Sequence, residues 1–375
     1  MVTDKELERL SEKFALRMTK VNEVTLKTIG NRINKIGKMS TSDLLAISKM
    51  QMYGEDINKI FAELEKQTGK NVNEIEQMYN AIADKDFKDN KSNFKDIEFV
   101  PYKENEKAQN LVKAIAEQTK GEMENISRTQ AIGFSKVVDG KVRYVSVTKA
   151  YEEAIDTAIT SVVTGVSDYQ TEMYKVLKPL ADSGVRTIDY ASGYSRRLDS
   201  SVRQMVLNGT RQVNQEMTNE VGEQFGADGY EITAHGDCAE DHLDIQGKQY
   251  SKKEYERLNS NLDRPIGTLN CKHFAYPIIL GVNLPAYSKS ELRELRKEST
   301  RKIEYEGKTY TAYEATQVQR KMETKIRQLK ESKYLGNDII DKEANAKIRA
   351  LTRKYKDFSE KAKLPTKLNR LRVAR

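Results

Sequence analysis

The sequence predicts a mainly α-helical, elongated protein that carries one small α+β module. Of its 375 residues, 32% are charged, 38% are hydrophobic and only 6 are proline, which is typical of solvated helices around modest cores. Apolar residues recur at helical spacing over most of the chain, whereas glycine and proline gather between residues 230 and 287. These two sequence patterns predict long helices on both sides of a compact, turn-rich segment.

The N-terminal region, residues 1–125, is expected to be helical. Four apolar residues there share one face of an amphipathic helix that follows the Ser/Thr/Asp cluster at 40–43: Ile57, Ile60, Phe61 and Leu64. Residues 83–107 lose this periodicity and are rich in Asp, Asn and Lys. A linker or mobile loop is therefore expected there.

The region 126–225 is expected to hold a hairpin followed by long central helices. Strands at 134–138 and 142–147 are joined by Asp139-Gly140, which supplies the positive φ angles of a tight turn. One helical face follows, formed by Tyr151, Ala154, Ile155, Ala158, Ile159, Val162, Val166 and Tyr169. This helix is expected to end near Pro179 or Gly184. A second long helix carries Leu198, Val202, Met205, Val206, Val213, Met217 and Val221.

Residues 226–287 are expected to form a compact α+β module, and residues 288–375 a basic helical tail. Three capping boxes predict helix starts in these regions: Ser251 with Glu254, Ser288 with Glu291, and Thr311 with Glu314. A small hairpin is expected at 303–310 around Glu306-Gly307. No internal repeat is evident.

The net charge of +8 is unevenly distributed. Residues 288–375 contain 25 basic and 13 acidic residues, a net of +12, so the preceding residues carry −4. The last fifteen residues contain no acidic residue and six basic ones, which are Lys361, Lys363, Lys367, Arg370, Arg372 and Arg375. Such a segment is typical of contact with double-stranded DNA or an acidic protein surface. The alternative is a frayed helix end that only aids solubility.

Several protein classes are not expected. The N-terminus lacks the apolar stretch of a signal peptide, and no run of about 18 apolar residues occurs; secretion and a membrane span are therefore unexpected. Two cysteines cannot form a disulfide framework, and a reducing compartment is expected. Neither G-x-x-x-x-G-K-[ST] nor G-x-G-x-x-G occurs, which excludes the common phosphate-cradling enzymes.

All cysteines and histidines of the chain lie close together in the sequence, at His235, Cys238, His242, Cys271 and His273. Cys238 and His242 would share one face of a helical turn, and Cys271 and His273 one face of a strand. Together these two pairs would form a Cys2His2 metal site, with His235 as a substitute ligand. A structural zinc ion is the cofactor that such a site would hold.

Other interpretations of this cluster stay open. The C-x3-H and C-x-H spacings differ from those of the usual zinc fingers. The side chains could instead be buried and satisfied by hydrogen bonds, or Cys238 and Cys271 could form a disulfide. A catalytic Cys/His dyad oriented by Asp237 or Asp241 is a further alternative, although no oxyanion turn or nucleophile elbow accompanies it.

Three ordered blocks of the chain resemble one known family. Residues 235–282, HGDCAEDHLDIQGKQYSKKEYERLNSNLDRPIGTLNCKHFAYPIILGV, resemble the core of the phage minor capsid protein 2 family, a branch of the MuF-type head morphogenesis proteins. The blocks LADSGVRTIDYASGYSRRLDSSVRQMVLNGTRQ at 180–212 and YEGKTYTAYEATQVQRKMETKIRQLK at 305–330 resemble the flanking parts of that family. The family's Cys and His positions correspond to Cys238, His242, Cys271 and His273, with no catalytic role attached.

This resemblance implies a virion structural protein of a tailed phage or prophage, not an enzyme. It implies a place in the phage head interior, and in the bacterial host cytoplasm during assembly. The partners implied are the portal, scaffolding or major capsid protein, with DNA packaging or ejection as further roles and no membrane contact. The rival hypotheses are a Cys/His-centred hydrolase acting on nucleic acid or peptide, and a DNA-binding module independent of any capsid.

Overall fold

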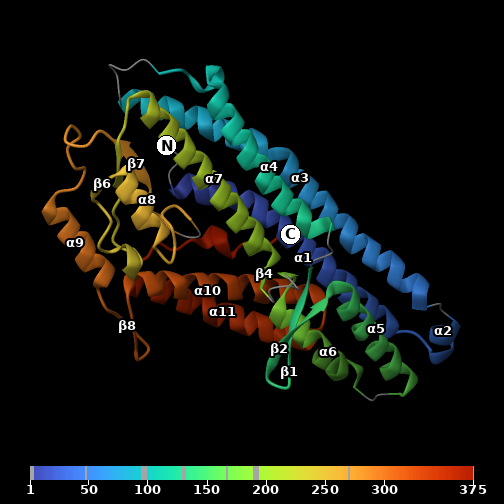
Figure 1. Ribbon diagram of the computed structural model, residues 1–375. Coiled ribbons are helices and arrows are strands. Elements are labelled where there is room, and N and C mark those ends of the chain that lie inside the picture. The colour runs from blue at the N-terminus through green and yellow to red at the C-terminus, as the bar shows by residue number, and fades with distance from the viewer. Residues whose placement is uncertain are drawn as a thin grey trace.

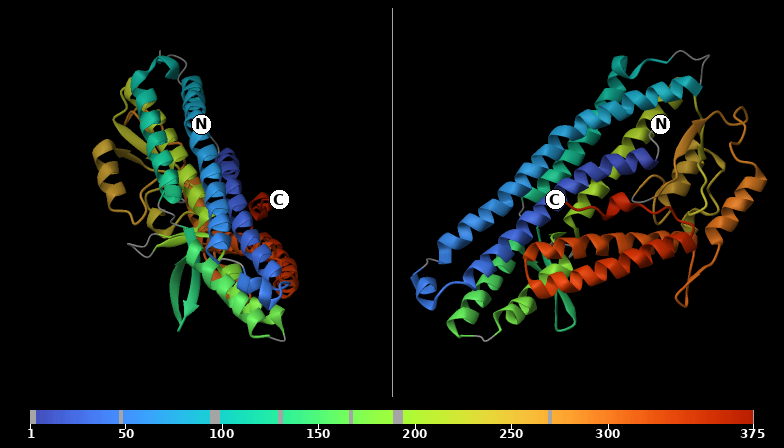
Figure 2. Two further views of the ribbon diagram at one scale, coloured as in Figure 1. Left: turned by 90° about the vertical axis from the view of Figure 1, so that its right-hand side faces the viewer. Right: turned by 180° about the vertical axis from the view of Figure 1, so that it is seen from behind.

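Long helices lying side by side dominate the protein. The computed structural model describes residues 4–46, 49–93, 99–128, 132–165, 168–188, 194–268 and 271–374. Figure 1 shows four long helices running together across the molecule: α1 (Asp4–Ile36), α3 (Lys49–Asn93), α4 (Glu106–Arg128) and α7 (Leu198–Gln224). The short α2 (Thr41–Ala46) lies between α1 and α3, and the 3-10 turn η1 (Tyr102–Glu104) lies between α3 and α4. The mainly α-helical, elongated fold is confirmed (Figure 2).

The linker expected at 83–107 is wrong over most of its length. Helix α3 continues without a break to Asn93, and α4 starts at Glu106; residues 94–98 lie outside the described residues. Ala83 and Phe87 are buried in α3, and the Phe87 ring lies 5.9 Å from that of Tyr102 in η1. A few apolar residues suffice here because neighbouring helices cover them, so a polar composition did not indicate a loop.

One continuous hydrophobic core spans the N-terminal and central regions. It extends from Leu7 in α1 through Val221 in α7 and includes Leu335 and Ile340 near the C-terminal end. The boundary expected near residue 125 therefore does not separate two cores.

A four-stranded antiparallel sheet, ordered β2-β1-β3-β4, lies beside the central helices. Its strands are β1 (Ile132–Val138), β2 (Lys141–Ser146), β3 (Arg186–Ile188) and β4 (Ser195–Arg197). The predicted hairpin is confirmed: Val138 pairs with Lys141, and Asp139 and Gly140 adopt φ angles of 52° and 73°. Figure 1 shows this hairpin projecting from the helical body.

The helix predicted after the hairpin is two helices. Helix α5 (Val147–Val163) ends before Gly165, which has a φ of 69°, and α6 (Tyr169–Ser183) begins after a new cap in which Asp168 accepts from Thr171 N. Both helices face the same core, so one apolar stripe did not reveal the break. Pro179 lies inside α6, and Gly184 is the C-cap that follows its last residue, Ser183. Val166 lies outside the described residues.

The turn-rich segment forms a three-stranded antiparallel sheet ordered β6-β5-β7. Its elements are β5 (Gly229–Ile232), the 3-10 turn η2 (Glu240–His242), β6 (Gln249–Ser251), α8 (Lys252–Ser260) and β7 (Ala275–Ile278). Its apolar cluster is small, with Ile232, Ile245, Ile266 and Ala275 buried. The module is attached to the helical body, since Gln215 of α7 donates to the Ala275 carbonyl oxygen at 2.9 Å.

The C-terminal region is a packed helical hairpin. Helix α9 (Lys289–Thr300) leads to β8 (Ile303–Tyr305) and β9 (Lys308–Tyr310), which form the predicted hairpin, and then to α10 (Ala312–Ser332), η3 (Lys333–Leu335), α11 (Asp338–Lys361) and η4 (Leu368–Leu371). All three predicted capping boxes are present. A Cβ atom at Gly30 would lie 2.0 Å from the Leu335 carbonyl oxygen, so glycine permits the close approach of α1 to η3. Of the helices in the described residues, none has the length and apolar character needed to cross a membrane.

Residues 367–374 lie against α1 and do not form a frayed helix end (Figure 2). Lys367 and Arg370 both pair with Glu8, and the Ala374 amide donates to Thr19 Oγ1 at 2.8 Å. Two of the six basic residues in the last fifteen positions are therefore paired with a carboxylate of α1. Lys361 lies 3.6 Å from Asp357, Lys363 and Arg372 are exposed, and Arg375 lies outside the described residues.

A buried ionic network joins the N-terminal, central and C-terminal helices. Arg197 is 4% exposed and Glu331 is 0% exposed, and their side chains form an ion pair. Asp199 bridges two guanidinium groups, at 3.1 Å from Arg197 Nε and 3.0 Å from Arg327 Nε. Asn22 of α1 donates to Glu331 Oε1 at 3.2 Å. Burial acts to raise the pKa of Asp199, but Arg197 and Arg327 hold it at about 2. We call these five residues the buried junction.

We predict that Glu331→Ala lowers the free energy of unfolding by about 3 to 5 kcal/mol, because it leaves the two buried guanidinium groups of Arg197 and Arg327 to share the single charge of Asp199. Chemical denaturation monitored by circular dichroism would measure this loss. The control is Glu294→Ala, which removes an ion pair with Lys297 between two largely exposed side chains and should change stability little. Equal effects of the two substitutions would contradict a central role for the buried junction.

Candidate metal centre

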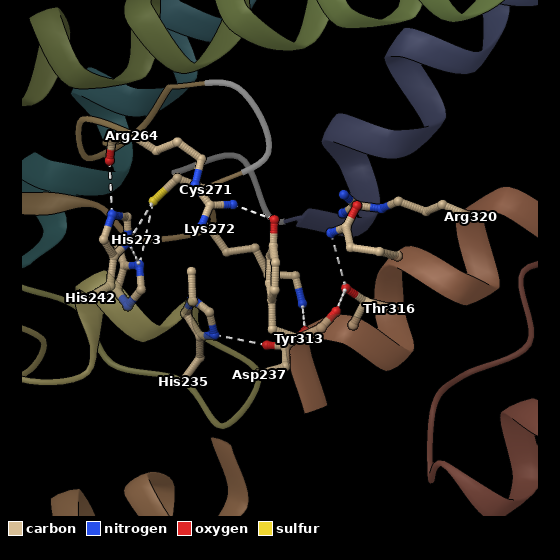
Figure 3. Close-up of a pocket in the computed structure, with 12 residues that line it drawn as sticks. His235, Asp237, His242, Arg264, Cys271, Lys272, His273, Tyr313, Thr316 and Arg320 are labelled. Atoms are coloured by element: carbon tan, nitrogen blue, oxygen red, sulfur yellow. Dashed lines mark hydrogen bonds and ion pairs between the residues drawn. The ribbon is translucent and has the colours of Figure 1, made fainter. Parts of the chain in front are cut away.

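Three of the predicted ligands converge at the edge of the small sheet. His242 lies in η2, and Cys271 and His273 lie in the segment that leads into β7. Their donor atoms all lie within 4.8 Å of one another. The two Nδ1 atoms are 3.1 Å apart, and Cys271 Sγ is 3.6 Å from that of His242 and 3.4 Å from that of His273. Figure 3 shows the three side chains turned toward one another.

The outer nitrogens of both imidazoles face oxygen acceptors. His242 Nε2 lies 2.8 Å from the Arg264 carbonyl oxygen, and His273 Nε2 lies 3.0 Å from Gln246 Oε1. An acceptor at Nε2 places the proton there and leaves the Nδ1 lone pair free. Both rings therefore direct a lone pair toward the Cys271 sulfur and toward each other, which is how histidine ligands are commonly oriented around metals.

The environment favours neutral imidazole at one ligand and thiolate at another. Burial, with the nearby His235 and His242, lowers the pKa of His273 to about 2. Burial acts to raise the pKa of the Cys271 thiol, but hydrogen bonding to His242 brings it below its ordinary value. For His242, burial acts to lower the pKa, but the hydrogen bond with Cys271 and the charge of that thiol raise it above its ordinary value. Deprotonated thiol and imidazole groups are the forms that bind zinc.

The spacing of the three donors matches three corners of a tetrahedral zinc site. With zinc–nitrogen bonds near 2.0 to 2.1 Å and a zinc–sulfur bond near 2.3 Å, the edges of a tetrahedron are about 3.3 Å between nitrogens and about 3.5 Å between nitrogen and sulfur. The observed separations of 3.1, 3.4 and 3.6 Å lie close to these values. The residues present therefore fit a zinc ion.

Cys238 does not belong to this group, contrary to the prediction of a Cys2His2 set. Its buried sulfur lies 3.4 Å from Ser299 Oγ of α9, and burial raises the pKa of its thiol. The backbone at Ala239 is extended, so Cys238 and His242 do not share one helical turn. Both cysteines are free, which excludes the Cys238–Cys271 disulfide alternative.

His235, the predicted substitute ligand, lies beside the group. Its ring centroid is 4.2 Å from that of His273, and its Nδ1 atom is 2.8 Å from Asp237 Oδ1. Asp237 also pairs with Lys272. The Nε2 atom of His235 is buried and has no hydrogen-bond partner within the described residues. His235 was predicted as a substitute ligand, and it is the candidate for the fourth ligand position among the described side chains.

A small cavity of about 20 Å³ adjoins these residues. Helix α10 contributes Tyr313 and Arg320 to its wall, and the Arg264 guanidinium group lies 4.8 Å from the centroid of the Tyr313 ring. A cavity of roughly this volume accommodates about one water molecule. Sequence reasoning missed Gln246 and the Arg264 carbonyl group, because neither an amide side chain nor a backbone oxygen forms a recognisable ligand pattern.

Comparison with known proteins identifies a family. The sequence profile described as phage minor capsid protein 2 matches residues 2–360, nearly the whole chain. The chain belongs to this family. The resemblance seen in three sequence blocks is therefore confirmed, and the protein has a virion structural role. No curated protein and no solved structure matches the chain significantly.

The donor set predicts one zinc ion per chain of the minor capsid protein. Mass spectrometry of metals in the purified protein should find zinc in the wild type and lose it in Cys271→Ser, because that substitution replaces the sulfur ligand. Cys238→Ser is the matched control and should retain zinc, since the Cys238 sulfur contacts Ser299 instead. A wild-type protein that takes up no zinc from zinc-containing buffer would contradict the prediction, as would equal zinc content in the two variants.

Proposed function

We propose that this virion structural protein acts in head assembly by associating with the portal and with scaffolding or major capsid protein. Its family places it among capsid components, whose work is contact with other virion proteins. The observation that carries the proposal is the β1–β2 hairpin, which projects from the helical body (Figure 1). We further propose that it resides in the head interior, and in the host cytoplasm during assembly.

The hairpin has the features of a protein-docking element. Val137 and Val142 face one another across the two strands and are 73% and 58% exposed. Strand β2 is an edge strand of its sheet, with β1 on one side. An edge strand with exposed apolar side chains is suited to pairing with a strand of another protein. These properties support a protein partner for this surface.

We propose that fewer basic residues contact double-stranded DNA than the sequence suggested. Within the C-terminal segment, Lys363 and Arg372 are exposed, whereas Lys367 and Arg370 pair with Glu8. The exposed pair supports a limited contact with DNA or an acidic protein surface. A role in DNA packaging or ejection rests on that contact.

The rival hypothesis of a Cys/His-centred hydrolase has weaker support. Cys271 lies within 3.6 Å of a histidine nitrogen, as a dyad requires. However, the adjoining cavity has a volume of about 20 Å³, too small for a peptide or nucleotide. Family membership among capsid proteins also favours a structural role. We therefore propose that the metal centre stabilises the small module and takes no part in catalysis.

The hairpin proposal predicts that Val137→Lys with Val142→Lys lowers the amount of protein in purified heads several-fold. Charged side chains at an edge strand oppose strand pairing, and both valines are exposed, so the fold should be retained. Quantitative mass spectrometry of heads would measure incorporation, with circular dichroism as the check on folding.

Val163→Lys is the matched control, because Val163 is also an exposed valine but lies at the end of α5. It should leave incorporation unchanged. Normal incorporation of the folded hairpin variant would show that the hairpin is not the docking element. Absence of the wild-type protein from heads would overturn the assembly role itself.

A further inference from the structure

An arginine-rich cavity lies where β3, β4, the start of α7 and the middle of α10 meet. Its volume is about 440 Å³, and seven of its sixteen lining residues are arginines, against two acidic residues, Asp182 and Glu323. Such a concentration of guanidinium groups inside a protein is costly unless anions balance it. The partners of each arginine therefore decide what the cavity can bind.

Three of the seven arginines are balanced within the protein. Arg197 and Arg327 belong to the buried junction, where Asp199 and Glu331 neutralise them. Arg370 lies 2.9 Å from Glu8 and 3.4 Å from Glu323. Asp182, the other acidic residue of the wall, pairs with Lys178 and lies 3.7 Å from Lys325. The acidic groups around the cavity are thus already engaged.

The other four arginines have no carboxylate partner among the described residues. Arg186 donates to Ser195 Oγ at 2.6 Å and to the Ser195 carbonyl oxygen at 3.0 Å, and Arg196 lies over the Tyr194 ring. Arg203 and Arg320 each have a buried Nη1 atom without a hydrogen-bond partner in the described part of the chain. Arg197, though ion-paired and 4% exposed, also has an unpartnered Nη1.

Three of these four arginines have lowered pKa values, which reflects the electrostatic cost of holding their positive charges together. Burial, with the neighbouring charges of Arg327 and Arg370, lowers the pKa of Arg203 to about 10. Burial and Arg370 lower the pKa of Arg320, and burial and Arg197 lower that of Arg186. Each of these guanidinium groups would be stabilised by an anion in the cavity.

We propose that this cavity binds a phosphate group. A carboxylate satisfies one guanidinium fork, whereas a phosphate presents more acceptor oxygens and more charge and can bind several forks together. Helix α7 begins at Leu198 beside the cavity and contributes the Ser200 side chain to its wall, and helix N-termini favour anions. The inference goes beyond the role in head assembly and does not depend on it.

The size of the cavity limits the source of the phosphate. A volume of about 440 Å³ is in the range of small-molecule sites and cannot admit a DNA duplex. The phosphate is therefore either a free inorganic ion or the terminal phosphate of a nucleic acid strand. Both sources present the same chemistry to the arginines, and an experiment can separate them.

The test is isothermal titration calorimetry on the full chain at constant ionic strength. Inorganic phosphate should bind the wild type, and Arg203→Gln with Arg320→Gln should weaken this binding by at least about tenfold, since two charge-assisted donors are lost. The control Arg349→Gln removes an exposed arginine of α11 and should leave binding unchanged. Equal affinity of the double variant and the wild type would overturn the proposal.

A melting-temperature measurement separates ligand binding from a structural role. In phosphate-free buffer the double variant should melt no lower than the wild type, because it removes two guanidinium groups that lack carboxylate partners. In phosphate the wild type alone should gain stability. If the double variant does not fold, the same measurement can be made on the single variant Arg203→Gln. A double variant that is destabilised in both buffers by the same amount would indicate that these arginines only support the fold, and would overturn the proposal.

A third titration compares a single-stranded oligonucleotide carrying a 5′-phosphate with the same strand carrying a 5′-hydroxyl. Binding of the phosphorylated strand alone would support a nucleic acid terminus as the source. Binding of inorganic phosphate but neither strand would support the free ion. Binding of an oligo-aspartate peptide, with no response to either form of phosphate, would overturn phosphate in favour of an acidic protein segment.

Discussion

The fold depends on the buried junction formed by Asn22, Arg197, Asp199, Arg327 and Glu331. Its members come from α1, the β4–α7 connection and α10, segments separated by up to 309 positions in the sequence. Moving four charged groups out of water is unfavourable unless each is met by a partner of good geometry. The ion pairs of the network therefore form only when the three segments dock in one arrangement, which makes the C-terminal helices part of the main body.

Features that depend on local chemistry could be predicted from the sequence. Asp139-Gly140 and Glu306-Gly307 adopt positive φ angles at two hairpins, and the three capping boxes start three helices. In each case a few adjacent residues determine the conformation. The continuation of α3 to Asn93 could not be predicted in this way, because the burial of Phe87 depends on Tyr102 and on helices distant in sequence.

At the metal centre, too, the sequence indicated which residues lie close together in the chain but not the contacts that folding adds. The gathering of cysteine and histidine in one segment correctly pointed to a cluster, and three of the four chosen ligands converge. Cys238 does not, because the extended backbone at Ala239 separates it from His242 and a serine on α9 lies against its sulfur. The oxygen acceptors that orient both imidazoles were not predictable, since one of them is the backbone of Arg264.

Which positive charges are left without an acidic partner depends on the fold more than on the charge counts of the sequence. By segment, the positive charge belongs to residues 288–375, and that excess directed attention to the C-terminal segment. There, Lys367 and Arg370 pair with Glu8 of α1. The guanidinium groups without carboxylate partners come partly from the region of net negative charge, where Arg186 and Arg203 line a cavity with Arg320. Charge counts by segment do not locate an anion site, because folding brings acidic residues of α1 to the basic tail and leaves these arginines unbalanced.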